Sequence, residues 1–308
     1  MPLLDETFGI GDLARLTGVP VRTIRFYCDE GLIDSVRSTG GHRRFGRLAV
    51  ERLSLVRRLR GLGIGLPSVR LVLAGERSVA EAATAERAAL DLRIADLAWQ
   101  RASLRAIEEA GPAERAARLE LLAAVENGNA ARDALTGFWR RAMVVPVSEV
   151  MFSAFVTMAV PGPPDDPTPP QVVAYAELFA LAGDRELTRG LLAMARDNAE
   201  LVADEQELLT GIEEACVLAE PLVRAGAPPR AGHALDRFVA AHASVRGGDD
   251  TPRFRSRLLS HVAADRVPRM RRYWHLVAEA GGGTATPGVS HLWLTDALEH
   301  SVRSDGCR

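Results

Sequence analysis

The sequence predicts a mainly α-helical fold, with an N-terminal winged helix-turn-helix domain, a long dimerisation helix and an all-helical C-terminal domain. Three observations lead to this fold class. Two short helical segments near the N-terminus are joined by a glycine turn and followed by a Gly-Gly hairpin signal. Residues 78–109 are rich in alanine and contain neither glycine nor proline. Beyond residue 113, apolar residues recur at helical spacing and no stretch alternates convincingly as a strand.

The helix-turn-helix begins with residues 9–17, whose apolar side chains fall on one helical face, and Gly18 ends that helix. A second helix over residues 21–30 starts just after a proline, which suits the first helical turn. The stretch that follows lacks helical periodicity, and Gly40-Gly41 within it predicts a two-stranded wing. Further helices are expected over residues 48–62 and 66–73.

Residues 78–109 predict one long helix with an apolar seam at a roughly 3-4-7 spacing. Arg101 interrupts this seam, so its register is not clean. A long helix with one apolar seam and few aromatic residues is a candidate dimerisation helix. The alternative is an amphipathic helix that packs on its own C-terminal domain. The seam consists of Leu90, Ile94, Leu97 and Leu104.

The C-terminal part is expected to be a set of short helices. Residues 161–170 contain six prolines and two aspartates, which predicts a loop or internal linker. Residues 138–141 (Phe-Trp-Arg-Arg) and 272–275 (Arg-Tyr-Trp-His) echo one another, although two dipeptides do not establish a repeat. The expected helices are 114–126, 130–143, 147–159, 171–182, 185–199, 205–221, 232–243, 251–262, 268–280 and 289–303.

Charge is distributed unevenly along the chain. All 38 basic residues are arginine, and the net charge is −2. Residues 1–75 carry 12 arginines against 7 acidic residues, whereas the remainder carries 26 arginines against 33 acidic residues. The N-terminal segment is therefore the part expected to contact a polyanion.

Several classes of protein do not fit the sequence. No window reaches the run of about 18 apolar residues that a membrane helix needs, and the acidic start of the chain argues against export. Cys28, Cys216 and Cys307 are too widely spaced for a disulfide framework or a zinc pair. No nucleophile elbow, phosphate loop, zinc-binding helix or dinucleotide fingerprint is present, so no enzymatic activity or cofactor is expected. We expect a reduced cytoplasmic protein.

Two runs near the N-terminus, Ile10–Ile33 and Gly40–Phe45, resemble the MerR family of bacterial regulators. The resemblance covers about a quarter of the chain and is specific, because many fixed spacings agree at once. Cys28 stands where family members often have an acidic residue, and His42 stands where tyrosine is common. We expect Cys28 to pack behind the helix, with a redox role as the alternative. The matching pieces are Ile10–Ala14, Thr17–Val19, Val21–Tyr27, Glu30–Ile33, Gly40–Phe45 and Ile64–Leu66.

The residues themselves support DNA binding by this segment. Arginine and threonine side chains on a presented helix can reach base edges in a major groove, and arginines on a wing can contact flanking phosphates. The alternative is that these arginines only solvate a surface. The predicted DNA-binding residues are Thr17, Arg22, Thr23, Arg25, Tyr27, Arg37, His42, Arg43 and Arg44.

The resemblance implies a homodimer in which each subunit places one winged domain on half of a palindromic promoter operator. It also implies that effector binding bends and untwists the DNA so that RNA polymerase can engage the promoter. We expect residues 1–76 to form the DNA-binding domain, residues 77–111 the dimerisation helix and residues 112–308 the effector-binding or sensor domain.

The expected effector is a hydrophobic organic molecule. No cysteine lies between residues 29 and 215, and His233 and His242 lack a tight ligand spacing, so neither a metal site nor an iron–sulfur centre is expected. The segment 167–186 resembles the antibiotic-binding helical domain of TipA-like regulators over a few residues. Aromatic side chains commonly line apolar pockets, although any one of them also suits an ordinary core. The candidate effector-binding residues are Trp139, Tyr273, Trp274 and Trp293.

Two other functions remain open from the sequence. The helical domain could bind a protein partner, in which case the regulator would need no ligand. The protein could instead be a drug-sequestering resistance protein for which DNA binding is secondary. A well-formed apolar cavity favours a small-molecule ligand, whereas a flat exposed apolar patch favours a protein partner.

Overall fold

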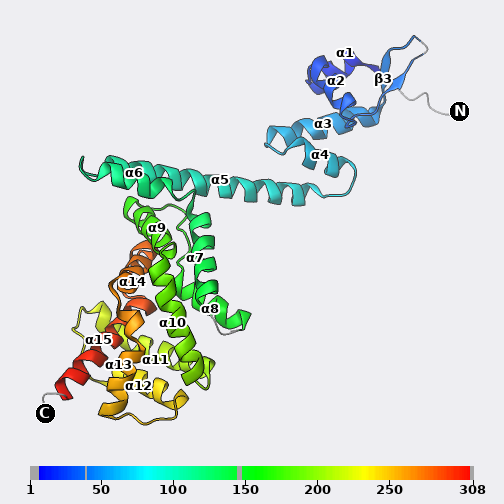
Figure 1. Cartoon of the computed structure of the whole chain (residues 1–308). Helices are drawn as coiled ribbons and strands as arrows, with labels where there is room; N and C mark the ends of the chain where they lie inside the picture. The colour runs from blue at the N-terminus through cyan, green and yellow to red at the C-terminus, as the bar shows by residue number, and fades with distance from the viewer. Residues whose placement is uncertain (1–6, 39, 144–147, 306–308) are drawn as a thin grey trace. The chain divides into compact units, whose positions relative to one another are not determined.

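The computed structural model describes residues 7–38, 40–143 and 148–305, with the backbone alone described at 197–200, at 264–265 and at 305. The chain divides into two compact units, residues 1–94 and 95–308. Figure 1 traces the chain from the winged domain in blue to the last helix in red. The mainly α-helical fold predicted from the sequence is confirmed.

The first unit begins with a helix-turn-helix. Helices α1 (Ile10–Thr17) and α2 (Val21–Asp29) are separated by a turn at Gly18. Gly18 adopts φ 68°, and its N–H donates to the Ala14 carbonyl at 2.9 Å. A side chain is strained in this left-handed conformation, which is why glycine ends the helix here.

A three-stranded antiparallel sheet forms the wing, with strands in the order β1 (Phe8–Gly9), β3 (Arg43–Phe45) and β2 (Val36–Arg37). The sequence predicted the β2–β3 hairpin but not β1, because the two residues of β1 are too few to show alternation. At the tip of the hairpin Gly41 adopts φ 79°, and its N–H donates to the Ser38 carbonyl at 2.8 Å.

Helices α3 (Arg47–Gly61) and α4 (Leu66–Leu73) complete the hydrophobic core of the first unit. Its centre consists of completely buried side chains from the helices α1 to α4 and from β3. These side chains fix the backbone of α1 and α2, so the outer face of α2 is held on a rigid support. They are Leu13, Ile24, Phe45, Leu53, Val56 and Val69.

Helix α5 (Val79–Glu108) is continuous across the boundary between the two units. Within the second unit it packs through Trp99, Ala102 and Ala106, which are all at least 96% buried. At about 100° per residue, the predicted seam lies on the opposite side of the helix. Leu97 and Leu104 in that seam are 61% and 63% exposed. Helix α5 therefore packs on the C-terminal domain through a different face and leaves its apolar seam uncovered.

The described part of the second unit beyond α5 is entirely helical, in agreement with the prediction. The predicted start of one helix at residue 147 lies outside the described residues. The elements are α6 (Arg115–Ala123), α7 (Gly128–Ala142), α8 (Glu149–Ala159), α9 (Pro169–Ala182), α10 (Arg185–Leu201), α11 (Glu205–Arg224), α12 (His233–Val245), α13 (Pro252–His261), the 3-10 helix η1 (Ala263–Arg266), α14 (Pro268–Gly281) and α15 (Pro287–Asp305).

Side-chain caps begin several of these helices. The Asn127 side chain accepts a hydrogen bond from the Ala130 N–H at 2.8 Å at the start of α7. Ser148, Asp204 and Thr251 cap α8, α11 and α13 in the same way. Each cap satisfies a backbone donor that has no partner within its helix, which explains where these helices begin.

Two hydrophobic clusters fill the second unit. The first joins α5 to α7, α8, α9 and α14, with the aromatic side chains of Trp99, Phe138 and Tyr175 at its centre. The second joins α11, α12, α13 and α15 around Phe238 and Leu294. The presence of two clusters in one unit leaves a boundary between them, where the packing is shared by side chains from both.

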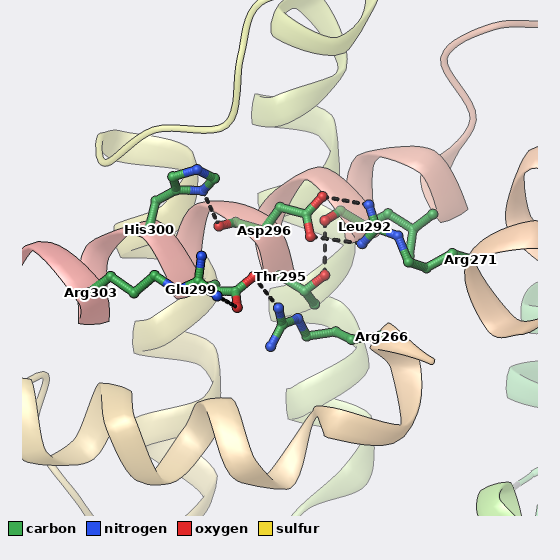
Figure 2. A network of polar contacts seen from close by, with 8 residues as sticks. All are labelled: Arg266, Arg271, Leu292, Thr295, Asp296, Glu299, His300 and Arg303. Atoms are coloured by element: carbon green, nitrogen blue, oxygen red, sulfur yellow. Dashed lines mark hydrogen bonds and ion pairs between the residues drawn. The ribbon is translucent and has the colours of Figure 1, made fainter. Parts of the chain in front are cut away.

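An arginine–carboxylate network connects α15 to α14 and η1 across this boundary (Figure 2). Arg271 of α14 donates two hydrogen bonds of 2.7 Å to the two carboxylate oxygens of Asp296. Glu299 of α15 accepts from Arg266 of η1 and, at 2.8 Å, from Arg303. Paired, partly buried hydrogen bonds of this kind set the position and direction of helices as well as contributing energy. The network therefore holds α15 against α14.

No helix among the described residues is sufficiently long and apolar to cross a membrane.

Candidate functional site

The outer face of α2 carries cations without partners. Arg22 and Arg25 are exposed, and neither forms a hydrogen bond or ion pair within the part of the chain that the structure describes. Thr23 beside them is half-buried. The inner face of the helix is held by Ile24, which is completely buried, so the two guanidinium groups project from a fixed helix. This arrangement suits a polyanionic partner.

Thr17 and Tyr27, also predicted to contact DNA, are placed differently. Thr17 is 4% exposed, and its hydroxyl donates to the Leu13 carbonyl at 2.7 Å. Tyr27 is 9% exposed and belongs to the core of the first unit. This burial gives both side chains a structural role. Their contact with DNA remains a prediction.

The two adjacent arginines of the wing differ in their surroundings. Side chains alternate between the faces of a strand, so Arg43 and Arg44 of β3 point to opposite sides. Arg43 forms a 2.9 Å ion pair with Asp29 at the end of α2. Arg44 donates to the Thr7 carbonyl at 2.7 Å. The sequence suggested one pair of equivalent phosphate contacts, whereas the structure places the two guanidinium groups on opposite faces.

Arg37 and His42 are the most accessible predicted residues of the wing. Both side chains are exposed, and Arg37 lies directly across the hairpin from Arg43 in the strand register. The wing thus presents Arg37 and His42 freely, while Arg43 is already engaged by a carboxylate.

Cys28 lies beside this ion pair and is half-buried. Burial raises the pKa of its thiol, although nearby Arg43 acts in the opposite direction. A raised pKa keeps the sulfur as a thiol, and reactive cysteines require the thiolate. The environment therefore favours the packing role for Cys28.

The second unit contains a cavity of about 270 Å³ at the boundary between its two hydrophobic clusters. The lining of the cavity is rich in aromatic residues and methionine, with Trp139, Phe155 and Trp274 as its largest side chains. Such walls suit a compact apolar ligand, because methionine adapts its shape to different ligands. The methionines that line it are Met143, Met158, Met194 and Met270.

The aromatic wall has a defined geometry. The rings of Trp139 and Trp274 are stacked at 5.9 Å and 27°, and Phe155 meets Trp139 edge-on at 4.9 Å. Trp139 Nε1 donates to the Tyr273 hydroxyl at 2.6 Å, and that hydroxyl donates to the Ala159 carbonyl at 2.9 Å. The two echoing segments of sequence, 138–141 and 272–275, therefore meet in this wall.

The four candidate effector residues fall into three groups. Trp139 and Trp274 line the cavity. Tyr273 is completely buried behind them and holds the Trp139 ring in place, and burial raises the pKa of its hydroxyl. Trp293 lies at a separate hollow, where its Nε1 donates to the Ala227 carbonyl at 2.8 Å.

Gly288 at the start of α15 is needed for this wall. A Cβ atom placed on Gly288 would lie 2.1 Å from Cε3 of Trp274, which is far too close for non-bonded atoms. The absence of a side chain at this position therefore allows α15 to approach the indole ring.

The lining of the cavity also includes polar residues, which were not anticipated from the sequence. It includes His242 of α12, Arg246, His261 of α13 and His291 of α15. Their separation along the chain matches no ligand motif. A weaker signal was present, since six of the seven histidines lie between residues 233 and 300. Cys216 also lines the cavity, whereas Cys307 lies outside the described residues.

The described residues contain no group of three or more His, Cys, Asp or Glu side chains that could hold a metal ion.

The first unit combines a helix-turn-helix, exposed arginines on the outer face of its second helix and a three-stranded wing, which defines a winged helix-turn-helix domain of the DNA-binding class. Residues 8–76 match the family described as MerR HTH family regulatory protein. The HTH-type transcriptional regulator ZntR of Escherichia coli K12 is 30% identical over 135 residues, which cover 39% of this chain and 94% of ZntR. The chain belongs to the MerR family of transcription regulators.

Other relatives match over shorter stretches. The nodulation protein NolA of Bradyrhizobium elkanii is 37% identical over 97 residues, covering 31% of this chain and 44% of NolA. The HTH-type transcriptional activator TipA of Streptomyces coelicolor is 38% identical over 68 residues, covering 22% of this chain and 27% of TipA. The chain thus spans less than half the length of these two relatives, and the likeness of the C-terminal domain to TipA stays a prediction. No solved structure matches the chain.

Proposed function

We propose that this MerR-family regulator binds a palindromic promoter operator as a homodimer and distorts the DNA in response to a hydrophobic small molecule. The observation that carries the proposal is the cavity of about 270 Å³, with its stacked Trp139 and Trp274 rings. A ligand-binding cavity attached to a DNA-binding domain is what a ligand-gated regulator requires.

The exposed seam of α5 supports the homodimer. Ile94, Leu97 and Leu104 are each more than 60% exposed, and the buried face of the helix lies opposite to them. Arg101, which interrupts the seam, forms an ion pair with Asp166 of the proline-rich loop. Contiguous exposed apolar side chains on a long helix are covered most simply by the same helix of a second copy.

The packing of α5 offers a route from ligand to DNA. Trp139 and Trp274 in the cavity wall belong to the same hydrophobic cluster as Trp99, Ala102 and Ala106 of α5. Because close-packed side chains transmit small displacements, a ligand that moves the indole rings also changes the support of α5. The ligand must bind the two states of the regulator unequally for this change to alter transcription.

In this proposal Arg22, Thr23 and Arg25 contact base edges, while the wing contacts phosphates through Arg37, His42, Arg43 and Arg44. Replacing an arginine that contacts a base edge lowers the discrimination between operator and random DNA. Replacing an arginine that contacts a phosphate weakens binding to all DNA and lowers the salt dependence of that binding. Arg22→Ala is therefore expected to lower the ratio of operator to random DNA affinity about tenfold. An equal loss of affinity for operator and random DNA would indicate that Arg22 contacts the phosphate backbone of the DNA instead of a base.

Two other functions make different demands on the structure. A ligand-independent regulator with a protein partner has no need of the cavity, so the cavity favours a small molecule. A drug-sequestering resistance protein would use the same cavity, but ligand binding would leave DNA affinity and transcription unchanged.

The test measures DNA binding and transcription with RNA polymerase at the promoter of the protein's own gene, with and without a panel of hydrophobic drug-like compounds. We expect at least one compound to change transcription strongly while changing DNA affinity only modestly. A compound that binds tightly without any effect on transcription would favour sequestration. Normal promoter binding with no active compound would favour a protein partner.

A further inference from the structure

His242 is the most deeply buried polar residue of the cavity wall. It lies on α12 and is 4% exposed. Its Nδ1 atom is 2.7 Å from Nη1 of Arg246. A guanidinium group can only donate hydrogen bonds, so Nδ1 must be the acceptor in this contact. The proton of the neutral ring is therefore carried by Nε2.

The surroundings of His242 keep the ring neutral. Burial lowers the pKa of His242 well below its ordinary value of 6.5, and the nearby Arg246, His291 and His261 act in the same direction. The ring of Phe238 packs edge-on at 4.7 Å and contributes no charge. His242 is thus a neutral donor at neutral pH, and its tautomer is set by Arg246.

The Nε2–H group has no acceptor among the described residues, although the atom is buried. Buried donors in proteins nearly always have a partner, because an unpaired one loses its hydration without compensation. His242 lines the cavity, so a ligand in the cavity is the natural source of the missing acceptor.

The rest of the cavity indicates the remainder of the ligand. Trp139, Phe155 and Trp274 also line the cavity, and aromatic side chains of this kind favour an aromatic ligand through offset or edge-on stacking. The ligand therefore has to carry both an aromatic ring and a hydrogen-bond acceptor.

Building on the proposed effector role of the cavity, we infer that the effector is an aromatic compound with an oxygen atom that accepts a hydrogen bond from His242 Nε2–H. A ketone, an amide carbonyl and a carboxylate all meet this description. Purely hydrocarbon compounds and compounds whose only polar group is a donor do not.

Three matched probes test the inference on the full-length protein. Biphenyl lacks an acceptor, 4-acetylbiphenyl carries a neutral one and biphenyl-4-carboxylate carries an anionic one. Binding is measured by quenching of tryptophan fluorescence and by calorimetry. We expect at least one of the two acceptor probes to bind about five- to tenfold more tightly than biphenyl. The comparison between these two distinguishes a neutral from an acidic ligand.

Variants at position 242 isolate the hydrogen bond. His242→Phe keeps an aromatic ring without a donor, and it is expected to abolish the preference for the acceptor probes while leaving the affinity for biphenyl within about twofold. His242→Gln retains an N–H donor and is expected to restore part of the preference. His275→Phe on the exposed side of α14 is the matched control.

The outcomes test the acceptor inference and the effector role of the cavity separately. Equal binding of all three probes to the wild-type protein would overturn the acceptor inference while the cavity remained a ligand site. An unchanged preference in both His242 variants would also overturn it. Failure of every probe to bind would count against the effector role of the cavity itself.

Discussion

The predicted DNA-contacting surface and the cavity differ in how far apart their residues lie in the sequence and in whether those residues belong to the core. The predicted DNA-contacting residues lie between Thr17 and Arg44, whereas the cavity wall draws on residues from Trp139 to His291. The exposed arginines of α2 stand outside the core, but Trp139 and Trp274 are themselves core residues. Substitutions of the exposed arginines of α2 should therefore change binding without changing stability, and substitutions in the cavity wall should change both.

The largest effect is expected on α5, which extends into both units. Leu97→Glu combined with Leu104→Glu places two charges in the exposed apolar seam. The affinity between subunits should fall by at least about a hundredfold, or ~2.7 kcal/mol, because charges in an apolar interface lose hydration without a partner. Sedimentation measures this affinity. Gln100→Glu, at an exposed position outside the seam, is the control. A double variant that remains dimeric would show that the seam is not the dimer interface.

A smaller effect tests the claim that the cavity wall is also core. Gly288→Ala forces the Trp274 ring away from α15, since the new Cβ would overlap it. We expect a loss of about 1–3 kcal/mol in the free energy of unfolding of the second unit, together with weaker ligand binding. Urea unfolding followed by tryptophan fluorescence measures the stability, and quenching of tryptophan fluorescence by the biphenyl probes measures the binding. Gly283→Ala meets nothing within 4 Å and is the control. Weaker ligand binding at unchanged stability would contradict the claim that the cavity wall is also part of the core.

The next prediction concerns pH. The unfolded chain protonates His242 with its ordinary pKa of 6.5, whereas the folded protein resists protonation until a much lower pH. Below pH 6.5 the unfolded state therefore binds the extra proton, and stability falls by about 1.4 kcal/mol per pH unit from this group. Above pH 6.5 the group contributes no pH dependence. His242→Phe should flatten this part of the profile in denaturant unfolding, and exposed His275→Phe should not. An identical dependence of the unfolding free energy on pH in the His242 variant would show that His242 is not the group responsible.

The smallest effect is expected on the wing, where Asp29 holds Arg43 in a 2.9 Å ion pair. Asp29→Asn removes a negative charge near DNA and releases Arg43, so affinity for all DNA should rise about two- to threefold with a steeper salt dependence. Salt titrations of binding to operator and random DNA measure this change. Glu51→Gln, an exposed carboxylate on α3, is the control for the loss of one negative charge. A decrease in affinity would show that the ion pair orients Arg43 productively.

The sequence predicted much of the fold, because its signals are local. Gly18 and Gly41 occupy left-handed conformations where the sequence predicted turns, and the predicted helices of the second unit are present. The two-residue strand β1 was not predicted, since its pairing with β3 depends on a partner more than thirty residues away. The burial of Thr17 was also unforeseen, because a threonine beside an apolar helical face gives no sign of which way its side chain points.

The sequence alone determined the family, the helix-turn-helix, the wing hairpin and the long helix with its apolar seam. These features depend on residues close together in the chain, so their spacing reveals them. Only the tertiary structure decided which face of α5 is buried, why Arg43 and Arg44 differ, and that Trp139 and Trp274 line one cavity with His242. Such relations join side chains from different elements, more than a hundred positions apart for Trp139 and Trp274, and packing rather than periodicity brings them together.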